Sequence, residues 1–161
     1  MCKSIDVAVA MLNKSIDYAF EYNEPKYYMD YVKLHKLLYL GQCYILSRYG
    51  LRLFEEDITA HNCGPYVDGI GTIPANYGFG VIKEKIQGDN SKGIIYLPLT
   101  FSRDETVNEI LKEFGMCTTD EVVRITKETI PFKGKEGMFD NHPSISKEQL
   151  IEAGKDLFVQ K

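Results

Sequence analysis

Two segments in the first third of the chain carry a helical spacing of apolar residues, and they constrain the fold more than any other feature. In residues 4–21 apolar side chains recur every three or four positions, and Ser4 is placed to cap the helix that this spacing predicts. The second segment follows Asp30, a capping residue, and ends at Gly50, a natural helix stop. Spacing, cap and stop agree in both segments, so the sequence predicts two long helices. The apolar stripe of the second helix supplies three predicted core residues: Leu37, Leu38 and Ile45.

Shorter elements are predicted immediately after these helices. Glycine is frequent in residues 51–80, where Pro65 suits the first turn of a short helix that Pro74 limits. Residues 81–87 and 93–99 contain apolar residues and flank a short polar loop, a pattern typical of a β-hairpin. The sequence therefore predicts a small sheet in this part of the chain.

Three further helices are predicted in the C-terminal part of the chain. The first is capped by Ser102 or Asp104, and the second by Thr118 or Thr119. The third follows Ser146, which begins a capping-box pattern ahead of apolar residues. Helical segments thus account for most of the predicted structure.

These elements predict a mainly α fold, a single compact helical domain over residues 1–161 with a small inserted β-hairpin. A chain of 161 residues, 44% of them apolar, is long enough to form one hydrophobic core. The apolar runs are shorter than the ~20 residues that cross a bilayer and no export signal is evident, so we expect a cytoplasmic protein without a membrane partner. The formal net charge of −4 and a pI of ≈ 5.4 disfavour nucleic acid as a partner.

The search for a catalytic group centres on Cys63, two residues after His61 in the sequence HNCGP. A thiolate beside a histidine is a simple covalent catalyst, and His61 or His35 could supply the base. Side chains two positions apart in an irregular loop need not converge, and no orienting carboxylate can be identified. We therefore predict no catalytic residue, and keep a small cysteine-dependent hydrolase or transferase as an alternative.

The sequence also predicts no metal and no cofactor. Its 3 histidines and 4 cysteines show no paired ligand spacing beyond the HxC of residues 61–63, and no CxxC occurs. The glycines of residues 64–80 do not form a GxxxxGK[ST] phosphate loop, and turn formation explains them.

Tyrosine is the one compositional excess, with 11 residues that lie mostly in the first two predicted helices and their link. Tyrosine offers a large contact area with a polar tip, which suits a protein-binding surface. The same cluster also suits an interface between two helices, and the sequence leaves both interpretations open.

Residues 33–65, KLHKLLYLGQCYILSRYGLRLFEEDITAHNCGP, resemble the core signature of the Panacea family of SocA-like antitoxins, also described as phage-associated proteins. That signature has a helix reading KLQKLLYFAQ, a Tyr-Gly, a Leu-Phe-acidic segment, an Ala-Trp pair and a Tyr-Gly-Pro. Order and spacing agree over the whole segment, and weaker similarity continues to TKETIPFK at residues 126–133. The sequence departs from the pattern at His61, Lys127 and Phe132, where the family has Trp, His and Trp.

The resemblance implies an antitoxin that binds a cognate toxin protein and neutralises it, commonly on a prophage or another mobile element. It implies no enzymatic activity and no cofactor. A DNA-binding regulator of its own operon is kept as a further alternative. Whether the chain forms a homo-oligomer is left open by the residues.

A glycine–proline turn and an amphipathic helix can present a fixed shape to another protein. We therefore expect the second helix and the loop around Pro65 to form the partner-binding surface. Its predicted exposed rim consists of six residues: Tyr39, Gln42, Glu55, Asn62, Pro65 and Tyr66.

Overall fold

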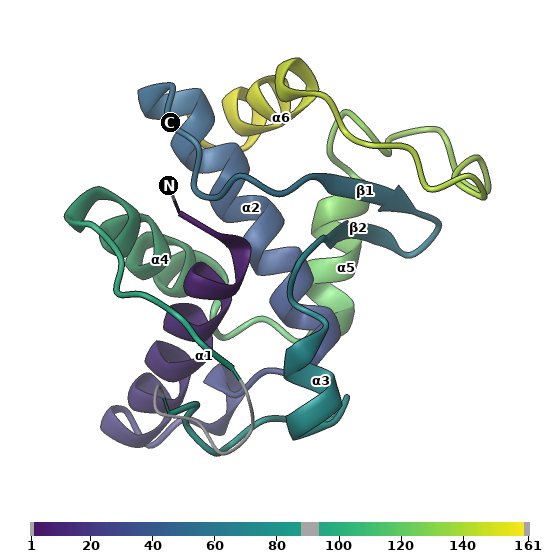
Figure 1. Cartoon of the computed structure of the whole chain (residues 1–161). Coiled ribbons are helices and arrows are strands. Elements are labelled where there is room, and N and C mark those ends of the chain that lie inside the picture. Colours follow the sequence, from purple (N-terminus) through teal and green to yellow (C-terminus); the bar gives the residue numbers. More distant parts are fainter. Residues whose placement is uncertain (1, 88–93, 160–161) are drawn as a thin grey trace.

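The structure, a computed structural model, describes residues 2–87 and 94–159 and is mainly α with a small two-stranded antiparallel sheet (Figure 1). The helices are α1 (Ser4–Glu21), α2 (Tyr31–Tyr49), α3 (Thr72–Tyr77), α4 (Phe101–Phe114), α5 (Thr119–Lys127) and α6 (Lys147–Gly154). The strands are β1 (Ile58–His61) and β2 (Gly64–Val67). Two short helical turns complete the elements: the 3-10 turn η1 (Pro25–Tyr27) and the π turn η2 (Lys155–Val159).

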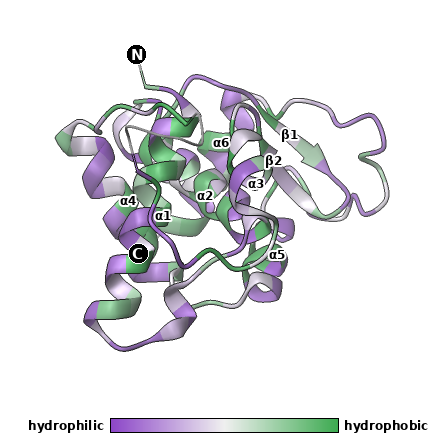
Figure 2. Ribbon diagram, turned by 60° about the horizontal axis from the view of Figure 1, so that its bottom comes forward, coloured by the Kyte–Doolittle hydropathy of each residue, from purple (hydrophilic) through white to green (hydrophobic). Residues whose placement is uncertain are grey.

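Helix α2 lies at the centre of the fold. It contacts α1, α4, α5, α6 and β2, which surround it in Figure 1. Every residue from Lys33 to Leu46 is buried, so this helix presents no solvent-facing side over most of its length. Leu37, Leu38 and Ile45 are fully buried, which confirms them as core residues. In Figure 2 the apolar positions gather where α1 and α2 meet.

The two long helices have the predicted bounds, and one of the predicted caps is correct. The Asp30 carboxylate accepts from the Lys33 backbone N–H at 2.8 Å, and Gly50 ends α2 in the left-handed conformation with φ 69°. Ser4 is the first residue of α1 rather than its cap, because Lys3 occupies the cap position. The Ser4 hydroxyl instead donates to the Asp68 carbonyl at 2.6 Å.

The hairpin exists, but the prediction that it spans residues 81–99 is wrong. It is formed by β1 and β2, in which His61 pairs with Gly64 across the turn, and the polar loop predicted at 88–92 lies outside the described residues. Residues 81–87 lie against α1 instead, where the Asn13 side chain donates to the Ile86 carbonyl at 3.1 Å and accepts from its N–H at 2.9 Å. The Asn13 side chain thus pairs with the backbone N–H and carbonyl of Ile86, two groups that a neighbouring strand would otherwise have paired.

The prediction that Pro65 begins a helix is also wrong. Pro65 lies in β2 opposite Ala60. The sheet has two strands, so neither is an inner strand, and proline, which has no N–H to donate, is tolerated there. The short helix begins at Thr72, and Pro74 lies in its first turn, where a backbone N–H has no helical partner.

The C-terminal helices agree better with the sequence. Helix α4 begins at Phe101, ahead of both predicted caps, and Thr100 takes the cap position. Capping boxes that begin at Thr118 and Ser146 start α5 and α6 as predicted.

Candidate protein-interaction surface

Half of the predicted exposed rim is buried, so the prediction of its exposure is wrong at Tyr39, Gln42 and Pro65. The Tyr39 hydroxyl lies 2.7 Å from Thr129 Oγ1, inside the contact between α2 and the end of α5. Pro65 is buried, and its carbonyl accepts from Lys36 Nζ of α2 at 3.0 Å. These residues support the fold and are not placed to touch a partner.

Gln42 shows why a polar residue of α2 is buried. Its Oε1 accepts from the Leu53 N–H at 2.6 Å and its Nε2 donates to the Phe54 carbonyl at 3.0 Å. The side chain therefore pairs two buried backbone groups in the irregular segment that follows α2.

Gln42→Leu is expected to lower the free energy of unfolding by about 2 kcal/mol, because two buried backbone groups lose their partners while the side-chain volume is nearly conserved. Urea denaturation followed by circular dichroism measures the change. Gln87→Leu, at an exposed glutamine, is the matched control and is expected to change stability by less than about 0.5 kcal/mol. Equal stability of the native and Gln42→Leu proteins would contradict this role.

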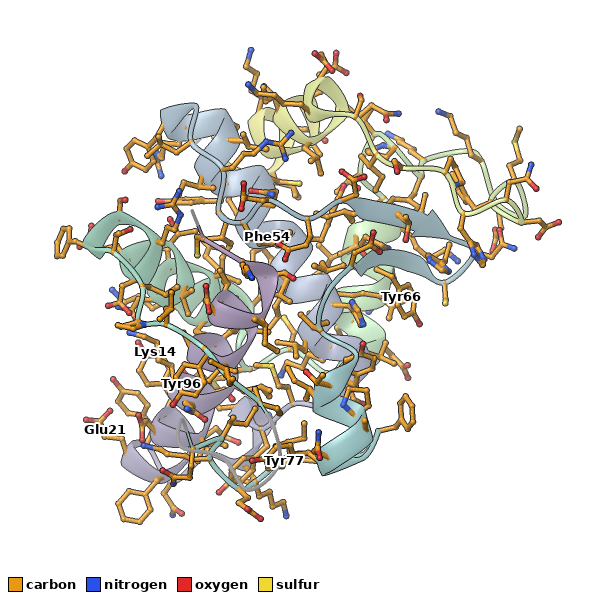
Figure 3. All side chains as sticks on the ribbon, in the orientation of Figure 1. Lys14, Glu21, Phe54, Tyr66, Tyr77 and Tyr96 are labelled. Atoms are coloured by element: carbon orange, nitrogen blue, oxygen red, sulfur yellow. The ribbon has the colours of Figure 1, made fainter. Side chains whose placement is uncertain are left out.

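The other predicted residues separate into two places. Glu55 is exposed, and its backbone N–H donates to the Cys2 carbonyl at 3.1 Å near the N-terminus. Tyr66 lies on the hairpin, and Figure 3 shows it well apart from Phe54, the neighbour of Glu55. Asn62, Pro65 and Tyr66 therefore share the hairpin, and Glu55 does not belong with them.

The hairpin turn meets the loop of residues 132–143, and Figure 1 shows the two side by side. Asn62 makes the junction: its Nδ2 donates to Asp140 Oδ1 at 2.9 Å, and its Oδ1 accepts from the Phe139 N–H at 3.1 Å. The His61 and His142 rings stack at 3.8 Å between centroids. Sequence reasoning missed His142, although His61 was marked by its departure from the family's tryptophan.

We call the exposed and half-exposed residues at this junction the hairpin patch. It consists of His61, Asn62, Cys63, Tyr66, Met138 and His142. Met138 is 71% exposed and directly precedes Phe139, whose N–H bonds to Asn62, so this junction also carries a flexible apolar side chain.

Helix α2 holds the base of the hairpin by buried polar groups. His35 Nδ1 accepts from the Val67 N–H at 2.8 Å, and Lys36 Nζ donates to the Pro65 carbonyl at 3.0 Å. The same Nζ lies 3.9 Å from the centre of the Tyr66 ring, a cation–π distance. The hairpin is thus fixed to the central helix through β2.

The contact between β2 and Lys36 explains why glycine and proline occur at positions 64 and 65. Gly64 has φ 110°, a conformation that favours glycine, and a Cβ there would lie 3.2 Å from Lys36 Cε and 3.3 Å from Thr126 Oγ1. The absence of a side chain lets β2 approach Lys36 closely. Pro65 then offers its carbonyl to the buried ammonium group.

Two lysines of α2 are almost completely buried. Lys33 Nζ donates to the carbonyls of Lys26 at 3.0 Å and Gly115 at 2.7 Å. Burial lowers the pKa of Lys33 to about 8, and burial likewise lowers the pKa of Lys36 to about 8. Both lysines connect α2 to other elements by donating to backbone oxygens.

The contacts of Cys63 do not form a nucleophile–base pair. Its thiol lies 3.4 Å from the Tyr66 hydroxyl, whereas His61 Nε2 lies 3.0 Å from Thr59 Oγ1. His35 is buried with Nδ1 bonded to β2. Each candidate base is thus engaged with another group.

Within residues 2–87 and 94–159, no group of three or more histidine, cysteine, aspartate or glutamate side chains is placed to hold a metal ion. None of the helices described is both long and apolar enough to span a bilayer.

Comparison with known proteins assigns the family. The model of the family described as "Antitoxin SocA-like, Panacea domain" matches residues 34–131, more than half of the chain, including most of α2, the hairpin and α5. No significant match was found among curated proteins or among solved structures. The chain therefore belongs to the SocA-like antitoxin family, the Panacea-domain family.

Proposed function

We propose that this chain neutralises a toxin protein by direct contact, and that the hairpin patch is the contact surface. Family membership supports an antitoxin-type function. The proposed partner is a toxin encoded beside this chain, on a prophage or another mobile element, and both proteins act in the cytoplasm. Neutralisation by contact needs no reaction by the antitoxin.

The fixed shape of the patch is the observation that carries the proposal. Asn62 ties the turn to the loop of residues 132–143, while His35 and Lys36 tie β2 to the central helix. A surface that is already ordered loses little conformational entropy on binding. Tyr66, Met138 and the stacked histidine rings add aromatic and sulfur-containing contact area of the kind that dominates protein interfaces.

Met138→Asp is expected to abolish protection when the chain is co-expressed with the toxin gene that neighbours it. A buried, unpaired carboxylate in the interface should lower colony survival at least about ten-fold. Colony counts with and without toxin induction measure the effect. Met116→Asp is the matched control, because Met116 is 46% exposed and lies between α4 and α5, outside the patch.

The outcomes separate the surface from the function. A neighbour that is harmless alone, or that kills despite the native chain, would rule out the antitoxin proposal. Full protection by Met138→Asp would place the contact elsewhere and leave the function standing. Cys63→Ser keeps a hydroxyl near Tyr66 and removes the thiol, so it should protect like the native chain; loss of protection by a folded variant that still binds the toxin would favour the cysteine-dependent enzyme.

A further inference from the structure

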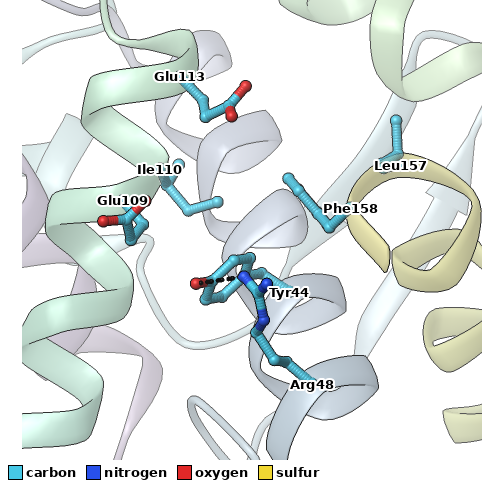
Figure 4. A pocket seen from close by; sticks show the side chains of 7 residues that line it. All are labelled: Tyr44, Arg48, Glu109, Ile110, Glu113, Leu157 and Phe158. Atoms are coloured by element: carbon cyan, nitrogen blue, oxygen red, sulfur yellow. Dashed lines mark hydrogen bonds between the residues drawn. The ribbon is translucent and has the colours of Figure 1, made fainter. Parts of the chain in front are cut away.

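A groove runs between α2, α4 and η2 on the side of the fold away from the hairpin, as Figure 1 shows for α4 and the two strands. It consists of two hollows of about 180 Å³ and about 340 Å³. Tyr44 and Glu109 line both hollows, so the two lie side by side. Figure 4 shows the smaller hollow, with Phe158 and Ile110 on facing walls.

The groove has exposed apolar side chains at one end and partly covered ones at the other. Phe101 is 78% exposed and Tyr49 is 59% exposed, and both line the larger hollow with Leu51. In the smaller hollow the Phe158 ring meets the Tyr44 ring edge-on at 5.2 Å between centroids. Exposed aromatic residues grouped around a hollow mark a surface that another chain can cover.

The α4 wall of the groove is acidic. Glu105, Glu109 and Glu113 are all exposed and follow one another at intervals of four residues. Each interval rises about 6 Å along a helix, so the three carboxylates form a row about 12 Å long. Two positively charged side chains lie near these three carboxylates. Arg48 donates to the Tyr44 hydroxyl at 3.0 Å, and Lys112 Nζ lies 3.7 Å from the Glu109 carboxylate.

We propose that this groove docks a basic amphipathic helix of the toxin, with Lys or Arg at four-residue intervals beside an apolar stripe. The spacing of the carboxylates matches cations on one face of a second helix, and the apolar ends accept the stripe. The identity of the partner as a toxin rests on the proposed function. The groove is a second contact, separate from the hairpin patch.

The test titrates the whole chain with a fluorescent peptide of about 14 residues, built of Leu and Lys so that a helix carries Leu on one face and Lys beside it. The native chain is expected to bind this peptide, and binding should weaken when NaCl rises from about 50 mM to about 500 mM. Glu109→Lys/Glu113→Lys should weaken binding at least about ten-fold. Phe101→Ser should weaken it at least about three-fold, because an exposed anchor is lost.

Two controls make the loss specific. Glu148→Lys/Glu152→Lys changes the charge equally at the same spacing on the exposed side of α6, and it should bind like the native chain. A peptide with Glu in place of Lys should not bind the native chain. Urea midpoints of all variants establish that they are folded.

Several results would overturn the inference. Equal binding by the native chain and Glu109→Lys/Glu113→Lys, equal binding of the Glu peptide, or the same loss in the α6 control would each exclude a basic helix in this groove. Self-association in sedimentation that Phe101→Ser abolishes would show a second copy as the occupant. Peptide binding is measured without the toxin, so it tests the groove separately from the proposed function. The peptide can fail to bind although the chain protects against the toxin, and it can bind although the chain does not protect.

Discussion

Gly154→Ala is expected to lower the free energy of unfolding by about 3 kcal/mol, although alanine is the better helix former. Gly154 ends α6 at the point where this helix meets α2. A Cβ there would overlap the Cys43 carbonyl oxygen and the Ser47 hydroxyl, and would lie 2.6 Å from Ser47 Cβ. Both obstacles belong to the buried central helix, so the clash is relieved only by moving α6 away.

The sign of the effect is diagnostic. Helix propensity alone would make Gly154→Ala stabilising by up to about 1 kcal/mol, so a loss shows that close packing decides. Gly71→Ala is the control, because Gly71 has ordinary backbone angles and open space where a Cβ would lie. Urea denaturation of the two variants gives the comparison, and equal stabilities would show that α6 does not need this approach.

The long helices could be predicted because their signals are local. Asp30 and Gly50 act within one turn of α2, and the apolar spacing follows from helical geometry alone. The segment of residues 81–87 could not be predicted in the same way. Its apolar pattern suits a strand, but Asn13, distant in sequence, takes both backbone groups of Ile86.

The candidate site was predicted only in part, for a related reason. A stripe of apolar residues identifies one buried face, and it cannot reveal that α2 is enclosed on every side. Tyr39 and Gln42 were assigned to an exposed face that does not exist in the structure. Their partners Thr129, Leu53 and Phe54 lie in segments whose approach depends on the whole fold.

His35 is the least conventional of the buried polar groups in α2. Because Nδ1 accepts the Val67 N–H, the proton of the neutral ring lies on Nε2. Nε2 is buried and, among the residues that the structure describes, has no hydrogen-bond partner. The ring contacts those of Tyr31 and Tyr66, with centroids 4.4 Å and 4.6 Å away. This arrangement accommodates the neutral imidazole and opposes its charged form.

The consequence is a sensitivity of the hairpin attachment to acid. Burial, then the charge of Lys36, then His61 lower the pKa of His35 to about 3. In the unfolded chain the same group titrates near 6.5. Between these two pH values only the unfolded chain binds the proton, so stability is complete above about pH 6.5 and falls as the pH falls toward 3. A proton on Nδ1 would also remove the acceptor of the Val67 N–H.

The native chain is therefore expected to lose about 3 kcal/mol of stability through His35 between about pH 7 and about pH 4. His35→Asn can keep an oxygen acceptor for β2 and cannot take up the proton, so its stability should fall less over this range by about that amount. His142→Asn leaves His35 untouched and removes only the histidine that stacks on His61, at φ 46°, which asparagine tolerates, so it should retain most of the native pH dependence. Urea unfolding at each pH provides the measurement. Parallel curves for the native and His35→Asn proteins would mean that the buried imidazole is not the acid-sensitive link between the central helix and the hairpin.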